Sequence, residues 1–289
     1  MFNGTAGSFT VRFFYLYCMR KTVVSLVFLL ALKTTYAASV DTVSIFSNAM
    51  KKSNKCVVIK PNGYKKEKIG FPVVYLLHGY GGDYANWVKR VPELMHHADE
   101  LRLIIVCPDG SKGSWYIDSP VDSSMRFETY VGKEIPEYID ANYKTIKDRK
   151  ARAITGLSMG GHGGLFLGFR HAETFGACGS MSGGVDIRLY TKNWDLQKII
   201  GDTATHAADW NNLTVTNVIE NKLVQPLAIM IDCGTDDFFY AVNRTLHEKM
   251  LTLKIAHDYI ERPGKHDWNY WRNAVKYQLL FFKEYFNSK

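Results

Sequence analysis

Residues 151–164 read ARAITGLSMGGHGG, and this stretch is the most informative part of the chain about its architecture. Ser158 stands at the centre of a Gly-x-Ser-x-Gly pattern, between a short strand-like run and a helix-like segment. A nucleophilic serine needs a tight turn from strand to helix, in which side chains two positions before and after it would collide. Gly156 and Gly160 occupy those two positions. The pattern therefore predicts a nucleophilic Ser158 rather than a structural serine in a glycine-rich turn.

Strand-like and helix-like stretches alternate on both sides of this motif. Short runs that are apolar throughout predict parallel strands in a sheet that helices cover on both faces. The fold class is therefore α/β, with a mostly parallel central sheet in a single domain over residues 38–289. Residues 188–223 contain no clear strand and are expected to form an irregular helical insertion. We expect strands at 57–60, 73–77, 103–107, 151–155, 177–181, 227–232 and 257–261, and helices at 87–101, 128–143, 162–175, 242–254 and 267–286.

The N-terminal part of the chain has the features of an export signal. Residues 23–32 form an apolar run directly after Arg20 and Lys21. The run is shorter than the roughly 20 residues that span a membrane, and small residues follow at Ala37. We therefore expect residues 1–37 to be a cleaved signal peptide rather than a buried helix, with translation starting at Met19. Since no cysteine follows the cleavage position to carry a lipid, the expected location is secreted or periplasmic, without stable membrane insertion.

Composition and charge exclude several classes of protein. The chain has 289 residues, of which 46% are apolar and 22% charged, so it is neither disordered nor collagen-like nor a coiled coil. The formal net charge is +8, but four basic and no acidic residues lie in residues 1–37, which leaves +4 on the rest. No Lys/Arg-rich run of the nucleic-acid-binding type is present. We therefore expect no nucleic-acid partner.

The cysteines do not predict a metal site. The sequence contains no Cys-x-x-Cys pair and no Cys/His cluster with the spacing of a zinc site. One of the five cysteines, Cys18, leaves with the signal peptide, and the other four could pair in three ways. Their positions in or beside apolar runs favour small buried side chains over disulfides. These four are Cys56, Cys107, Cys178 and Cys233.

A nucleophilic serine needs a base and an acid that orients the base, and in this arrangement the acid and then the histidine follow the serine along the chain. The strand at 227–232 runs into a loop that offers Asp236 and Asp237, while Asp232 still lies within the strand. Loop chemistry alone does not separate Asp236 from Asp237, because aspartate also caps turns and helices. Of the nine histidines, His266 alone follows a strand in a flexible loop C-terminal to these acids. We therefore predict His266 as the base.

The oxyanion of an acyl-transfer reaction needs backbone N–H donors, which come in part from a loop after an early strand. Residues 73–77 lead into His78-Gly79-Tyr80-Gly81-Gly82, where glycines allow close approach of the backbone to a substrate. The N–H groups of Tyr80 and Met159 are the expected pair of donors. His78 is expected to hold this loop rather than to act as a base.

Four motifs, in this order along the chain, resemble the putative-esterase family of α/β-hydrolases. That family includes esterase D and S-formylglutathione hydrolases, feruloyl and acetylxylan esterases of carbohydrate esterase family 1, and the antigen 85 acyltransferases. The resemblance covers nearly all of residues 38–289 and implies the α/β-hydrolase fold, with Asp237 as the acid and Tyr80 as an oxyanion donor. It rests on LLHGYGG at 76–82, GLSMGG at 156–161, CGTDD at 233–237, and HDW with WR at 266–272.

The expected function is that of a serine esterase that needs no metal or cofactor. Since an exported member of this family meets extracellular esters, we expect small acyl esters as substrates, with acetyl or feruloyl groups on carbohydrate favoured. The alternatives are a broad short-chain carboxylesterase, an S-formylglutathione hydrolase-like thioesterase, an acyltransferase and a catalytically inactive binding module. Trp115 and Trp268 are candidate substrate contacts, although packing beneath the loops is an equal alternative. The sequence does not indicate the oligomeric state.

Overall fold

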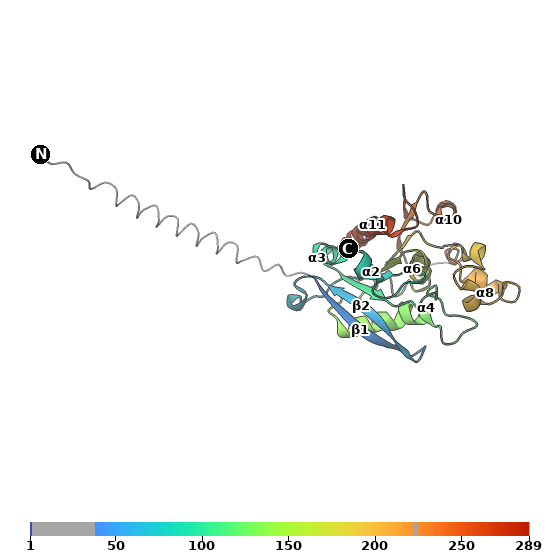
Figure 1. Cartoon of the computed structure of the whole chain (residues 1–289), viewed down its shortest axis with the longest axis horizontal. Coiled ribbons are helices and arrows are strands. Elements are labelled where there is room, and N and C mark those ends of the chain that lie inside the picture. Colours follow the sequence, from blue (N-terminus) through green and yellow to red (C-terminus); the bar gives the residue numbers. More distant parts are fainter. Residues whose placement is uncertain (2–37, 222–224, 289) are drawn as a thin grey trace. The chain divides into compact units, whose positions relative to one another are not determined.

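The computed structural model describes residue 1, residues 38–221 and residues 225–288 (Figure 1). Apart from residue 1, the predicted signal peptide at 1–37 lies outside the described residues. Residues 37–289 form one compact unit. Within the described residues, no helix is both long and apolar enough to span a membrane.

One eight-stranded sheet forms the centre of this unit, in the order β1-β2-β4-β3-β5-β6-β7-β8. The strands from β4 to β8 in this order run parallel, whereas β1 and β2 form an antiparallel hairpin, and β2 is antiparallel to β4. The predicted α/β architecture with a mostly parallel sheet is therefore confirmed. The strands are β1 (Ser39–Ser47), β2 (Lys52–Lys60), β3 (Val73–Leu77), β4 (Ile104–Pro108), β5 (Arg152–Gly156), β6 (Ala177–Met181), β7 (Ala228–Gly234) and β8 (Asp258–Arg262).

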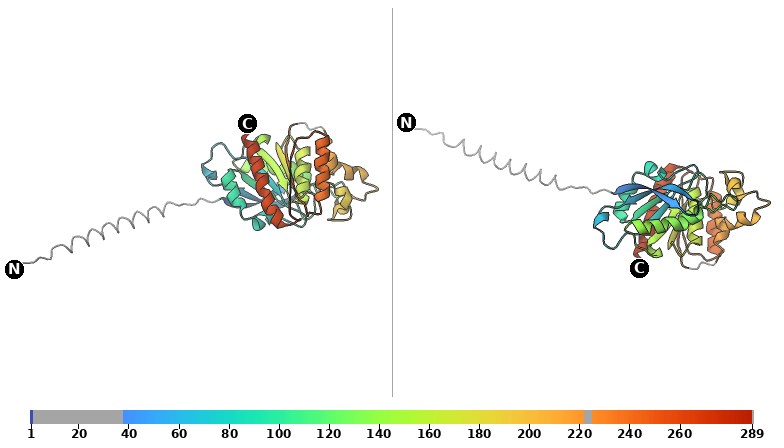
Figure 2. Two further views of the ribbon diagram at one scale, coloured as in Figure 1. Left: turned by 90° about the horizontal axis from the view of Figure 1, so that it is seen from above. Right: turned by 90° about the horizontal axis from the view of Figure 1, so that it is seen from below.

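Each central strand is apolar on both faces because helices cover both faces of the sheet. In β3, Val73, Tyr75 and Leu77 face one core and Val74 and Leu76 face the other, as the period of two in a strand requires. Figure 2 shows α11 and α3 along the same face of the sheet. The helices that pack on this face are α2 (Asn86–Arg90), α3 (Leu94–Leu101) and α11 (Trp268–Asn287), and those on the other are α5 (Ile135–Asn142), α6 (Met159–Arg170) and α10 (Tyr240–Thr252).

Two predicted helices differ from the structure, both at a proline, and one strand was not predicted. The single helix expected at 87–101 is two helices that break around Pro92, because proline has no N–H to continue the hydrogen-bond ladder. The helix expected at 128–143 starts as α4 (Phe127–Thr129) and passes through a π-helical segment, η2 (Tyr130–Glu134), before α5. This wider turn precedes Pro136, whose ring would clash with a carbonyl in a regular α-helix. The strand β1 was not predicted. It lies at an edge of the sheet, where most of its residues are exposed or half-buried, so it lacks a continuous apolar run.

The described part of the predicted insertion, residues 188–221, consists of short helices with irregular connections. Side chains from each of these helices pack into the same core as α6 and α10, so the insertion is part of the main body of the domain. Trp194, in the loop between the first two helices, reaches the pocket described below. The helices are η4 (Ile187–Tyr190), α7 (Leu196–Ile200), α8 (Ala207–Asn212) and α9 (Val215–Val218).

The carboxyl ends of four parallel strands converge on one edge of the sheet. β3 leads to Gly79, β5 to Ser158, β7 to Asp237 and β8 to His266. Loops at the carboxyl ends of parallel strands are where α/β proteins form their ligand sites. The topology thus brings together segments that are more than a hundred residues apart in sequence.

Candidate active site

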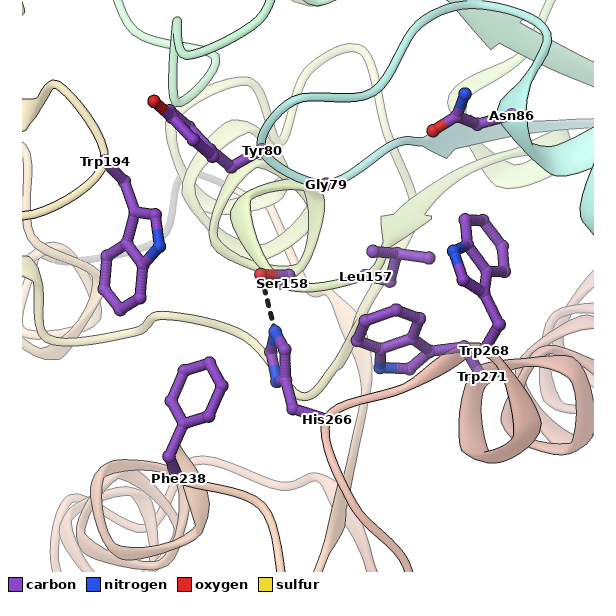
Figure 3. Close-up of a pocket in the computed structure, with 10 residues that line it drawn as sticks. All are labelled: Gly79, Tyr80, Asn86, Leu157, Ser158, Trp194, Phe238, His266, Trp268 and Trp271. Atoms are coloured by element: carbon purple, nitrogen blue, oxygen red, sulfur yellow. Dashed lines mark hydrogen bonds between the residues drawn. The ribbon is translucent and has the colours of Figure 1, made fainter.

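Ser158 occupies a strained turn between β5 and α6. Its backbone angles are φ 56° and ψ −115°, a conformation that costs a residue with a side chain about 1–3 kcal/mol. The turn is held by close backbone packing: a Cβ on Gly156 would lie 2.6 Å from the carbonyl oxygen of Gly160, and a Cβ on Gly160 would lie 2.6 Å from that of His78. The two glycines of the motif are therefore required by the space around them. The strained turn presents the Ser158 hydroxyl to the pocket (Figure 3).

His266 lies in the loop after β8 and points at Ser158. Its Nε2 is 2.9 Å from Ser158 Oγ (Figure 3), and its Nδ1 is 2.9 and 2.8 Å from the two carboxylate oxygens of Asp237. Since a carboxylate can only accept, Nδ1 carries the proton and Nε2 is free to accept the hydroxyl proton of the serine. The structure thus brings the three predicted residues into one hydrogen-bond chain.

The three competing aspartates have different surroundings. The Asp237 side chain is fully buried, and besides contacting His266 it accepts the N–H of Phe239 at 2.8 Å. Asp236 is exposed on the same loop, and its N–H donates to the carbonyl of Gly264. Asp232 is buried behind the loop, where it pairs with Arg262 and Tyr270 and burial raises the pKa of its carboxyl group. Only Asp237 among the three contacts His266.

Two backbone N–H groups beside Ser158 are free to bind an oxyanion. Among the described residues, neither the N–H of Tyr80 nor that of Met159 has a hydrogen-bond acceptor. Tyr80 lines the pocket, and Met159 is the first residue of α6, where backbone N–H groups have no partner within the helix. These are the two positions that the sequence predicted as oxyanion donors.

His78 holds the loop that carries Tyr80. Its Nε2 accepts the N–H of Gly110 at 2.8 Å and its Nδ1 donates to the carbonyl of Gly79 at 2.8 Å. Burial lowers the pKa of the His78 imidazole, which favours the neutral form that this pair of hydrogen bonds needs. His78 therefore ties the Tyr80 loop to the end of β4, as expected for a structural residue.

A cavity of about 200 Å³ opens beside Ser158 and has aromatic walls. Figure 3 shows Ser158 and His266 between two groups of side chains, with Trp194 and Phe238 on one side and Trp268 and Trp271 on the other. Phe238 is 54% exposed, so this wall also forms the rim of the cavity. The lining residues are Gly79, Tyr80, Asn86, Leu157, Ser158, Trp194, Phe238, His266, Trp268 and Trp271.

The two predicted substrate contacts have different positions. Trp268 lines the cavity and packs edge-on against Trp271, with ring centroids 5.5 Å apart. Trp115 is 1% exposed and does not line the cavity; its indole N–H instead donates to the carbonyl of Trp194 at 3.2 Å. The expectation of a substrate contact at Trp115 is therefore wrong, because its ring is enclosed beneath the insertion. Its packing supports the pocket wall that Trp194 forms.

Three aromatic residues of the pocket were not predicted from the sequence. Phe238 directly follows Asp237, and Trp271 lies in the motif that begins at His266, so nearness to motif residues was an available signal for both. No motif marks Trp194, which comes from the insertion. Only the tertiary contacts bring Trp194 close to Phe238, with ring centroids 5.9 Å apart.

The described cysteines do not line the cavity beside Ser158. The four cysteines from Cys56 to Cys233 are free and buried, which confirms the prediction of small buried side chains. Burial raises the pKa of each of these thiols. In the part of the chain that the structure describes, no group of three or more His, Cys, Asp or Glu residues could hold a metal ion.

Comparisons with known proteins identify the family and the fold. The family model described as "Putative esterase" matches residues 47–282. An acetyl esterase of Caldicellulosiruptor saccharolyticus is 27% identical over 255 residues, which cover 81% of this chain and 94% of the relative. The S-formylglutathione hydrolase of Bos taurus is 24% identical over 62% of this chain and 69% of its own length. A solved structure of a ferulic acid esterase has a TM-score of 0.74 at 27% identity and is matched over 87% of this chain and 100% of its own.

Proposed function

This chain belongs to the putative esterase family and is an esterase of the α/β-hydrolase fold, and we propose that it hydrolyses small acyl esters through a covalent acyl-enzyme on Ser158. The observation that carries the proposed mechanism is the continuous hydrogen-bond chain from Ser158 through His266 to Asp237. A catalytically inactive binding module has no need to keep this chain complete, so the geometry favours an enzyme.

In the proposed cycle, Ser158 Oγ attacks the ester carbonyl carbon while its proton passes to Nε2 of His266. The carbonyl oxygen becomes an oxyanion that accepts hydrogen bonds from the N–H groups of Tyr80 and Met159. Asp237 stabilises the imidazolium, which then gives its proton to the departing alcohol oxygen and leaves the acyl group on Ser158. Water attacks this acyl-enzyme with His266 again as the base, and the acid departs. Ester and water are the only reactants consumed.

The pocket supports acetyl or feruloyl esters of carbohydrates as the favoured substrates. Its volume of about 200 Å³ is below the roughly 300–1,000 Å³ of sites that enclose drug-sized ligands, so it suits a small acyl group. Aromatic rings such as Trp194 and Trp268 could stack on a sugar or on a phenolic ring at the open end. The similarity to an acetyl esterase and to a ferulic acid esterase supports the same substrate class.

The runner-up functions are those of a broad short-chain carboxylesterase and an S-formylglutathione thioesterase. The second is supported by the 24% identity to an S-formylglutathione hydrolase. Acyl transfer to an alcohol uses the same acyl-enzyme and differs only in the acceptor. Relative rates on different substrates separate these functions.

We expect kcat/KM to be highest for acetyl or feruloyl esters when four substrates are compared side by side. The four are p-nitrophenyl acetate, methyl ferulate, acetylated xylan and S-formylglutathione, each assayed by release of its acid or alcohol. The physical reason is that the aromatic rim can add binding energy for a sugar or phenolic group. A preference for the thioester would contradict the carbohydrate proposal, and activity on p-nitrophenyl acetate alone would leave the generic carboxylesterase. Added alcohol that diverts the product from acid to ester would indicate a transferase.

For residues 1–37 we propose a secretory signal peptide that is cleaved after Ala37. The Ala38 N–H donates to the carboxylate of Asp99 at 3.0 Å, so the α-ammonium group made by cleavage there would lie beside a carboxylate. Mass spectrometry of the protein exported by its own host should give Ala38 as the first residue. A chain that begins at Met1 or Met19 in the exported fraction would contradict this proposal.

A further inference from the structure

The Tyr80 side chain connects the proposed oxyanion loop to the insertion. Its hydroxyl donates a hydrogen bond of 2.7 Å to a carboxylate oxygen of Asp195, 115 residues further along the chain. The other oxygen of Asp195 pairs with Lys198 at 2.6 Å. The phenol therefore donates to a charged acceptor, and hydrogen bonds of this kind are stronger than those between neutral groups.

The side chain of Asp195 does not cap the helix that follows it. It stands at the N-terminal cap position of α7, where an aspartate side chain normally accepts a helix N–H, yet its side chain makes no such bond. Its φ is 57° and that of Trp194 is 49°, so two consecutive residues with side chains lie in the left-handed region. Strained residues persist where surrounding contacts hold them, and they occur preferentially at functional sites. Here the strained turn directs Asp195 at Tyr80 and places Trp194 in the pocket.

The Tyr80 ring is confined on its other side by the loop after β4. The N–H of Gly81 donates to the carbonyl of Lys112 at 2.7 Å, and a Cβ on Gly113 would lie 3.0 Å from Cε2 of Tyr80. The hydrogen bond to Asp195 raises the pKa of the Tyr80 hydroxyl, and those from Lys198 and Tyr80 lower the pKa of Asp195. Donor and acceptor therefore keep their roles over a wide pH range.

We propose that Asp195 is a positioning residue that, by holding the Tyr80 side chain, aims the Tyr80 backbone N–H at the oxyanion. This inference rests on the proposed function, since it needs Tyr80 as an oxyanion donor. A donor that serves only the transition state affects kcat and leaves substrate binding unchanged. Removing an oxyanion donor altogether lowers kcat by about 10²–10³, so misaiming it should have a smaller effect.

The test compares Tyr80→Phe, Asp195→Ala and the double variant on p-nitrophenyl acetate. Each single variant should lower kcat about tenfold with KM within about twofold of wild type, and the double variant should be no slower than the slower single variant. Asp195→Asn keeps an oxygen acceptor and should recover most of the loss. Asp202→Asn removes an exposed carboxylate from the same insertion and should leave kcat unchanged. Affinity for a trifluoromethyl ketone, which mimics the oxyanion, should fall in parallel with kcat.

Three results would overturn the inference while wild-type hydrolysis stands: a wild-type kcat in Asp195→Ala, multiplicative losses in the double variant, or equal losses in kcat and in ground-state binding. If Asp195→Ala does not fold, Tyr80→Phe carries the test, because it removes one oxygen and keeps the ring packing. An inactive wild-type enzyme would instead contradict the proposed function. The two failures are therefore distinguishable.

Discussion

Replacing Ser158 with alanine is expected to lower kcat on p-nitrophenyl acetate by about 10⁵–10⁶-fold, to the level that the oxyanion donors and substrate binding alone provide. Without the hydroxyl, His266 has no nucleophile to activate, since its Nε2 is 2.9 Å from Ser158 Oγ in the intact chain. The variant should fold, because alanine is smaller than serine and keeps the backbone of the turn. Steady-state hydrolysis, with thermal unfolding as the check on folding, measures the effect.

A fluorophosphonate probe provides an independent measurement on the same pair of proteins. The probe should label wild type on Ser158 and should not label Ser158→Ala, since it reacts with activated serines. Peptide mapping identifies the labelled residue. Wild type that hydrolyses esters but is labelled elsewhere would place the nucleophile outside this motif, and wild type that is neither labelled nor active would favour a binding module.

Asp237→Asn is expected to lower kcat by about 10⁴-fold with little change in KM. The side chain is fully buried against His266, so an amide of the same shape keeps the packing. The amide of asparagine can donate a hydrogen bond to Nδ1 of His266, which would place the imidazole proton on Nε2. A protonated Nε2 cannot accept the proton of Ser158. The measurement is kcat over the pH range in which the variant stays folded.

Asp236→Asn is the matched control, because it makes the same chemical change one residue away. Asp236 is exposed, and its backbone N–H rather than its carboxylate contacts the loop of His266. We expect kcat within about twofold of wild type. A large loss in Asp236→Asn together with a mild one in Asp237→Asn would move the acid to Asp236.

Much of the proposed site was predictable because its chemistry imposes local patterns. Ser158 needs glycines at 156 and 160, and the 2.6 Å approaches of backbone atoms at both positions show why no larger residue fits. His266 was predictable from its place in the loop after the last strand, since the carboxyl ends of parallel strands share one edge of the sheet. Burial on both faces left a readable apolar pattern in β3 and β4.

Other features depend on contacts that no local pattern encodes. Asp236 and Asp237 are adjacent and chemically identical, and only the course of the loop turns Asp237 towards His266 and Asp236 towards solvent. Trp115 and Trp194 look alike in sequence, yet one is enclosed and the other lines the pocket. β1 was missed because an edge strand is covered on fewer sides and therefore has fewer apolar residues.

The sequence alone was enough to predict the α/β class, Ser158, His266 and the oxyanion loop, because each leaves a pattern that can be read from neighbouring residues. The steric limit at Gly156, the place of His266 after a strand and the apolar run of each strand are patterns of this local kind. The acid, the aromatic pocket and the contact between Tyr80 and Asp195 depended on how distant segments meet. Contacts between distant segments are set by the packing of the whole chain: the Tyr80 hydroxyl lies 2.7 Å from a carboxylate oxygen of Asp195, 115 residues along the chain. A local sequence pattern carries no information about the distance between two such residues.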